Sequence, residues 1–128
     1  MTSGLQATTT AGQDLLALAG WLADEIAPRA AAHDRDGTYP HESLELLLDH
    51  GYLAAPVPAE LGGLGVESVH DLVVASARLA QGDPSLTIGV NMHLIAVLNL
   101  LRRHRVAQAA GNERRAQAFA GSLIATAS

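Results

Sequence analysis

Six histidines are the side chains in this sequence best suited to acid–base chemistry or metal binding. They are scattered along the chain, at His33, His41, His50, His70, His93 and His104. No two of them have the four-residue spacing that places two imidazoles on one helical face, and the chain contains no cysteine. The sequence therefore predicts no metal site and no thiol chemistry.

His93 and Asn91 are the two polar residues whose surroundings are unusual. Both lie inside the longest apolar stretch, Leu86 to Leu101. There His93 has three interpretations, a neutral imidazole packed in the core, a pocket residue or a base, and packing is the favoured one. Asn91 needs hydrogen-bond partners if such a helix is buried.

Charge is distributed unevenly along the chain. All eight basic residues are arginine, and the formal net charge is −5. Five of the arginines lie in residues 91–128 with one acid, whereas residues 1–90 carry twelve acids. An acidic chain with few aromatic residues is not typical of a nucleic-acid binder. The basic end instead suits an acidic neighbour, a cofactor phosphate or water.

Apolar periodicity and helix signals predict about five helices and an all-α fold. The predicted ranges are residues 12–33, in which Pro28 should kink the helix or end its regular part near Ala27, then 40–50, 67–81, 84–104 and 107–120 with a weak point at Gly111 and Asn112. Val69, Leu72 and Val73 are expected to be buried in the third helix. A proline-bracketed, glycine-rich loop separates the second helix from the third.

The two ends of the chain are predicted to differ from its middle. Residues 1–11 should form a flexible N-terminal tail and residues 12–122 one helical domain. Leu123, Ile124 and Thr126 favour a strand, so residues 123–128 read as the first residues of a missing β-domain. With 48% hydrophobic residues in 128, some apolar surface should need a partner. The tail has no leader features, and the apolar stretch is shorter than the roughly 20 residues of a membrane span. A cytoplasmic protein is expected.

Four segments in a fixed order carry a resemblance to a known family. They are APRAAAHDRDGTYP, HESLELLLDHGYL, PAELGGLG and ESVHDLVVASARLAQGDPSLTIGVNMH. From about Leu15 to Ser128, the chain resembles the N-terminal helical domain of acyl-CoA dehydrogenases. The order and spacing of the segments are more specific than any one of them.

The resemblance implies a flavoenzyme that removes hydrogen from acyl-CoA thioesters, uses FAD and forms a homo-oligomer. In that family the N-terminal helices pack with a C-terminal helical bundle, and a β-barrel domain holds much of the flavin. The base is a glutamate, usually in the C-terminal domain, and neither of these two domains is present in this chain. The chain alone is therefore expected to be inactive. Its part in the substrate site would be one wall of the acyl pocket, formed by Val90, Asn91, Leu94 and Ile95, with His93 nearby. The apolar residues of this set also have the spacing of ordinary core packing.

Two alternatives remain open from the sequence. One keeps the fold but makes the enzyme a reduced-flavin-dependent monooxygenase, in which His93 orients the substrate or assists the oxygen chemistry. The other is a helical interaction module without catalysis. Arg102, Arg103 and Arg105 have a similar ambiguity, since they suit either a coenzyme A phosphate or the C-terminus of a helix, and the helix C-terminus is preferred.

Overall fold

Five α-helices make up most of the part of the chain described by this computed structural model, residues 5–128. They are α1 (Thr10–Asp36), α2 (His41–Asp49), α3 (Val69–Ala80), α4 (Pro84–Ala109) and α5 (Glu113–Ala127), with two short 3-10 helices, η1 (Tyr52–Ala54) and η2 (Ala59–Leu61). No strand occurs in these residues, so the predicted all-α fold is confirmed.

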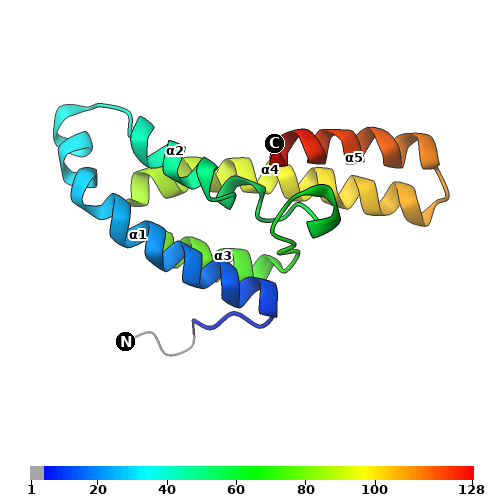
Figure 1. The fold of residues 1–128 in the computed structure, drawn as a ribbon, viewed down its shortest axis with the longest axis horizontal. Helices are drawn as coiled ribbons and strands as arrows, with labels where there is room; N and C mark the ends of the chain where they lie inside the picture. Colours follow the sequence, from blue (N-terminus) through cyan, green and yellow to red (C-terminus); the bar gives the residue numbers. More distant parts are fainter. Residues whose placement is uncertain (1–4) are drawn as a thin grey trace.

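The helices form two pairs, α1 with α3 and α4 with α5, and the pairs meet where α3 contacts α4. α1 packs on α3, and α5 turns back alongside the second half of α4 (Figure 1). The turn between α4 and α5 lies far from α1, so this helical hairpin projects to one side of the molecule. α2 and η1 cover the remaining side of the junction.

Local capping explains where the helices begin. The Asp83 carboxylate accepts a hydrogen bond of 3.1 Å from the backbone N–H of Leu86, and Pro84 occupies the first turn of α4, as the sequence predicts. Ser68 caps α3 in the same way, through the backbone N–H of Asp71. These caps fix the start of the two helices that border the candidate site described below.

Of the two effects predicted for Pro28, the end of the regular helix near Ala27 is wrong. α1 continues through Pro28 to Asp36 and ends at Gly37, which has a φ of 65°. Pro28 lies on the exposed side of α1, so the carbonyl that loses its backbone partner can face water. Meanwhile Ile26 stays packed on the opposite side. Tertiary packing of this face outweighs the cost of one missing hydrogen bond.

The two ends of the chain also differ from the prediction. Thr10 and Ala11, within the expected flexible tail of residues 1–11, belong to α1, while residues 1–4 lie outside the described chain. The strand expected at residues 123–128 is wrong, because α5 continues to Ala127. No strand lies among residues 5–128 to pair with it, and a helix satisfies its own backbone groups. Leu123 has no exposed surface.

The weak point predicted at Gly111 and Asn112 is the turn between two helices. α4 extends past the expected end near His104 to Ala109, and Asn112 caps α5 through the backbone N–H of Arg115. Gly111 takes a φ of 71°, which suits glycine in a tight turn. His104 is consequently an interior residue of α4, buried against α5, where its Nδ1 lies 2.9 Å from the Ala116 carbonyl oxygen.

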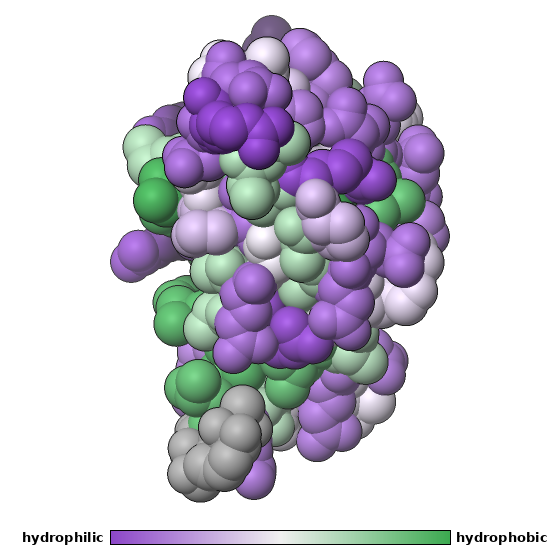
Figure 2. Space-filling model, turned by 90° about the vertical axis from the view of Figure 1, so that its left-hand side faces the viewer, coloured by the Kyte–Doolittle hydropathy of each residue, from purple (hydrophilic) through white to green (hydrophobic). Residues whose placement is uncertain are grey.

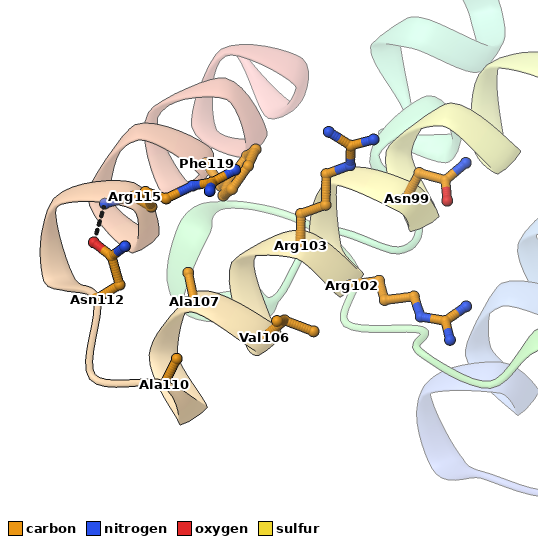
Figure 3. A pocket seen from close by; sticks show the side chains of 9 residues that line it. All are labelled: Asn99, Arg102, Arg103, Val106, Ala107, Ala110, Asn112, Arg115 and Phe119. Atoms are coloured by element: carbon orange, nitrogen blue, oxygen red, sulfur yellow. Dashed lines mark hydrogen bonds between the residues drawn. The ribbon is translucent and has the colours of Figure 1, made fainter.

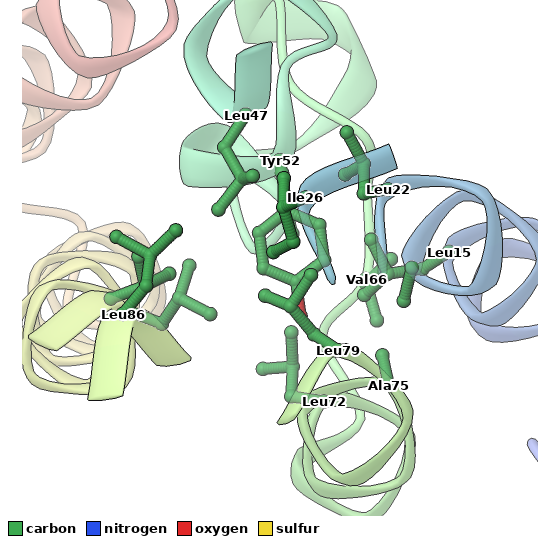
Figure 4. Packing of buried hydrophobic residues seen from close by; sticks show 14 residues of the cluster. Leu15, Leu22, Ile26, Leu47, Tyr52, Val66, Leu72, Ala75, Leu79 and Leu86 are labelled. Atoms are coloured by element: carbon green, nitrogen blue, oxygen red, sulfur yellow. The ribbon is translucent and has the colours of Figure 1, made fainter. Parts of the chain in front are cut away.

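The core has two parts. The larger cluster joins α1, α2, α3 and the first half of α4 around Tyr52, whose ring is fully buried (Figure 4). The smaller one joins η1, the following loop, α4 and α5 through Ala54, Val57, Val97, Leu101 and Leu123. The polar hydroxyl of Tyr52 thus sits inside an otherwise apolar centre.

α3 is rotated relative to the prediction. Val69 and Val73, expected to be buried, are each 60% exposed, whereas Asp71 has no exposed surface. The Asp71 carboxylate accepts hydrogen bonds from the backbone N–H groups and hydroxyls of Thr8 and Thr9, at 2.5 to 3.1 Å. A carboxylate satisfied in this way can face α1, so the valines turn outward.

The same hydrogen bonds make the free energy of unfolding depend on pH in the acid range. The Thr9 hydroxyl, followed by the Thr8 backbone N–H, lowers the pKa of Asp71 to about 2 from 3.8. The stabilisation is therefore complete above pH 3.8 and is lost as the pH falls through about 2. Urea unfolding between pH 5 and 2 should show this loss, and Asp71→Asn should make the acid limb shallower. Asp34→Asn, at an exposed position, should leave its slope unchanged.

α4 is long and apolar enough to cross a membrane by length and composition alone, with a mean hydropathy of 1.5 over the most apolar window. Here, however, Leu94, Val97 and Leu101 pack against the other helices. This is the environment of a central helix in a soluble domain.

Candidate functional site

A shallow groove of about 180 Å³ lies between α3 and α4. α3 contributes one wall and α4 the other, and nearly all of the lining is apolar. The lining residues are Val69, Leu72, Val73, Ser76, Asn91, Leu94, Ile95 and Leu98. Such a surface suits an apolar ligand or a packed partner, with a few polar groups for orientation.

The groove brings together three of the four predicted substrate-binding residues. Asn91 and Ile95 line it, and Ile95 is 55% exposed. Leu94 also lines it, but is only 3% exposed and forms its floor. Val90 does not line the groove, because it is buried in the larger core cluster. For Val90, the packing interpretation fits the structure better than a place in the pocket wall.

Ser76 and Asn91 form the polar part of the groove. The Ser76 hydroxyl donates a hydrogen bond of 2.7 Å to Oδ1 of Asn91. The side-chain amide N–H groups of Asn91 have no partner among the described residues, so they are available to an acceptor on a ligand. Asn91 therefore has a hydrogen-bond partner for its side-chain oxygen, but none among the described residues for its side-chain N–H groups.

Tyr52 lies under the same part of the fold. Its hydroxyl is buried without a hydrogen-bond partner in the described chain. Burial raises the pKa of Tyr52 to about 12, and the nearby Ser76 hydroxyl opposes this only in part, because it donates to Asn91. The phenol therefore stays neutral at physiological pH and does not serve as a base.

His93 faces away from this groove and toward a backbone group. Its Nε2 lies 2.8 Å from the carbonyl oxygen of Leu53 in η1. Because a carbonyl oxygen can only accept, Nε2 carries a proton and donates it to the Leu53 carbonyl. His93 thus ties α4 to the loop after α2, which is the packing role favoured by the sequence.

Sequence reasoning missed the contribution of α3 to the groove. Val69, Val73 and Ser76 follow helical spacing, but the two valines were assigned to the core. An inward Asp71 on α3 requires hydrogen-bond donors, which Thr8 and Thr9 supply. The periodicity of α3 does not show donors from so distant a part of the chain.

Exposed apolar side chains continue the groove along α4. Ile88 and Met92 are each 69% exposed and have the same helical spacing as Ile95. Figure 2 shows apolar areas interrupting the polar surface on one face of the molecule. Exposed apolar side chains, as expected from composition, are therefore present on α4.

Comparison with known proteins identifies the fold. The family described as acyl-CoA dehydrogenase, N-terminal domain, matches residues 15–119. The chain belongs to the acyl-CoA dehydrogenase family. Among curated members, the amino sugar nitrososynthase RubN8 of Streptomyces rubradiris is 40% identical over 85 residues, and the putative acyl-CoA dehydrogenase YdbM of Bacillus subtilis is 38% identical over 78.

Two solved structures of the acyl-CoA dehydrogenase fold match nearly the whole chain. KijD3, crystallised with FMN and dTDP-3-amino-2,3,6-trideoxy-4-keto-3-methyl-D-glucose, is 37% identical with a TM-score of 0.84 over 99% of this chain. The nitrososynthase from Micromonospora carbonacea var. africana is 33% identical with a TM-score of 0.85 over 99% of this chain.

The chain spans only part of the length of these relatives. The matched region covers 66% of this chain and 20% of RubN8, and 61% of this chain and 20% of YdbM. The same chain covers 30% of KijD3 and 32% of the Micromonospora enzyme.

Proposed function

We propose that this chain forms the N-terminal helical part of a flavin-dependent oxygenase that oxidises the amine of a nucleotide-linked amino sugar. The observation that carries this proposal is the similarity to KijD3 and to the Micromonospora nitrososynthase over 99% of the chain, at 37% and 33% identity, together with 40% identity to RubN8 over 66% of the chain. The proposal replaces acyl-CoA dehydrogenation, the leading expectation from the sequence, with a form of its monooxygenase alternative. FMN, the flavin in the KijD3 structure, takes the place of the expected FAD.

Within that reaction, the groove would hold the sugar end of the substrate. The free amide N–H groups of Asn91 can donate to a ring or carbonyl oxygen of the sugar. Ile95 and Val73 provide an apolar wall that excludes water beside it. His93 is engaged in its hydrogen bond to Leu53 in η1, so we assign it no chemical step.

The groove does not fit a flavin. At about 180 Å³ with apolar walls, it lacks the volume and the phosphate-binding donors that such a cofactor needs. We therefore assign no residue of this chain to flavin binding and route no step through it. In the complete enzyme, residues outside this chain would hold the reduced flavin, which would supply the electrons for the oxidation of the amine by O₂.

An assay of the complete gene product containing this chain tests the proposal. With reduced FMN, O₂ and a dTDP-amino sugar, the amine should be oxidised, and the product can be followed by mass spectrometry. Asn91→Ala should lower kcat/KM about tenfold, because a hydrogen bond to the substrate is lost. Gln108→Ala, at an exposed position on the same helix, should leave kcat/KM unchanged.

Acyl-CoA dehydrogenation remains a second candidate, supported by the apolar lining of the groove and by the similarity to YdbM. The two functions differ in their need for oxygen. Reduction of an artificial electron acceptor by an acyl-CoA without O₂, together with no amine oxidation, would refute the oxygenase and establish the dehydrogenase. Homo-oligomer formation by the complete enzyme is part of either proposal.

A further inference from the structure

A larger hollow lies between the last turns of α4 and the first turns of α5. Its volume is about 470 Å³, within the range of ligand pockets. Figure 3 shows the nine residues that line it. Arg102, Arg103 and Arg115 are among them, and none of these described lining residues is acidic. Positive charge is thus gathered at a concave surface of an acidic chain.

These arginines are not explained by structural ion pairs. Within residues 5–128, Arg102, Arg103 and Arg115 make none, whereas Arg105 bonds to Glu67 at 2.8 Å. The sequence interpretation as helix C-terminal charges also fails for Arg102 and Arg103, because α4 continues to Ala109. The favourable effect of the helix dipole is confined to the last turn.

The geometry of the hollow favours an anion. The Arg115 guanidinium lies over the ring of Phe119, 5.8 Å from its centroid, which limits its freedom before any ligand arrives. Figure 3 shows Arg103 reaching from α4 toward the same side as Arg115 and Phe119, while Arg102 points away. Small side chains at Ala107 and Ala110 leave the space between the two helices open.

We propose that Arg103 and Arg115 bind the diphosphate group of a nucleotide-linked ligand. Guanidinium groups match phosphate oxygens with paired hydrogen bonds, and two of them on facing helices suit a doubly charged group. Nucleotide sugars, coenzyme A and FAD all carry a diphosphate. We assign the site to the nucleotide sugar, and this assignment of the source rests on the proposed function.

The hollow and the groove lie apart on α4. Asn91 and Arg103 are separated by about 18 Å along the helix axis, at roughly 1.5 Å per residue. The sugar of a nucleotide sugar is bonded directly to its diphosphate, so one molecule does not contact both places. The diphosphate site and the contact of the sugar with Asn91 are therefore alternative placements of the substrate, which the Arg103→Gln and Asn91→Ala variants distinguish.

Binding to the 128-residue chain tests the proposal without any need for turnover. Isothermal titration at low salt would use pyrophosphate, dTDP, coenzyme A and FAD as separate ligands. Pyrophosphate and dTDP should bind, dTDP more tightly, and added salt should weaken both. Arg103→Gln and Arg115→Gln should each weaken binding about tenfold. Arg114→Gln, which makes the same charge change on α5 outside the hollow, should have less than about a twofold effect.

Each outcome has a distinct meaning once circular dichroism shows that the variants are folded. Absence of pyrophosphate binding, or equal weakening by Arg114→Gln, would overturn the diphosphate site. Tighter binding of coenzyme A or FAD than of dTDP would overturn its assignment to a nucleotide sugar. If dTDP binds through these arginines but the complete enzyme oxidises no amine, the proposed function fails while the site stands.

Discussion

Replacing Leu123 with alanine should lower the free energy of unfolding of this chain by about 3 kcal/mol, as expected for removal of a fully buried leucine. Leu123 has no exposed surface and packs with Val97, Leu101 and Val57 in the smaller core cluster. The cavity left by the substitution would lie between α5 and α4, where few other apolar contacts hold the hairpin together. Urea unfolding followed by circular dichroism measures the change.

Ile124→Ala provides the matched control, because it removes a side chain of the same size from the next position of α5. Ile124 is 47% exposed, so its loss should cost less than about 1 kcal/mol. If the two substitutions had equal effects, α5 would not be docked through Leu123.

The second large effect is expected from adding a single methyl group at Gly82, between α3 and α4. A Cβ at this position would collide with the backbone of Ala23 in α1, including its carbonyl oxygen. Backbone atoms cannot move aside as a flexible side chain can. We therefore expect Gly82→Ala to destabilise the fold by about 2 to 3 kcal/mol, in spite of the lower chain entropy of alanine.

Gly89→Ala makes the same chemical change without the collision. Gly89 lies within α4, and a Cβ there would meet nothing within 4 Å. Alanine should stabilise the helix by about 0.5 to 1 kcal/mol. The two variants can be compared in one denaturation experiment. A neutral Gly82→Ala would show that α1 does not approach the α3–α4 connection as closely as described.

The fold was largely predictable because its strongest signals are local. Asp83 followed by Pro84 sets the start of α4, and Gly51 follows the end of α2, as the residues indicate. The errors occur where distant packing outweighs local preference. Pro28 is tolerated because it faces water, and Leu123 is helical because α4 offers it a buried place. Neither the exposure of Pro28 nor the packing of Leu123 on α4 can be read from the neighbouring sequence.

The candidate site was predictable on one helix but not on the other. Asn91 and Ile95 were recognised from the resemblance and do line the groove, whereas Val90 does not. Val69 and Val73 were missed because valine normally faces the core and aspartate normally faces the solvent. Here four hydrogen bonds from Thr8 and Thr9 reverse that preference at Asp71.

The division of the core around α4 has a consequence for how the molecule fluctuates. The larger cluster contains no residue of α5, and the smaller one contains none of α1 or α3. Fraying of the C-terminal hairpin can therefore proceed while the α1–α3 pair keeps its packing, so the two halves should behave as separate cooperative units. A ligand that bridges Arg103 and Arg115 would hold the ends of α4 and α5 together, and its binding would make the C-terminal hairpin more rigid.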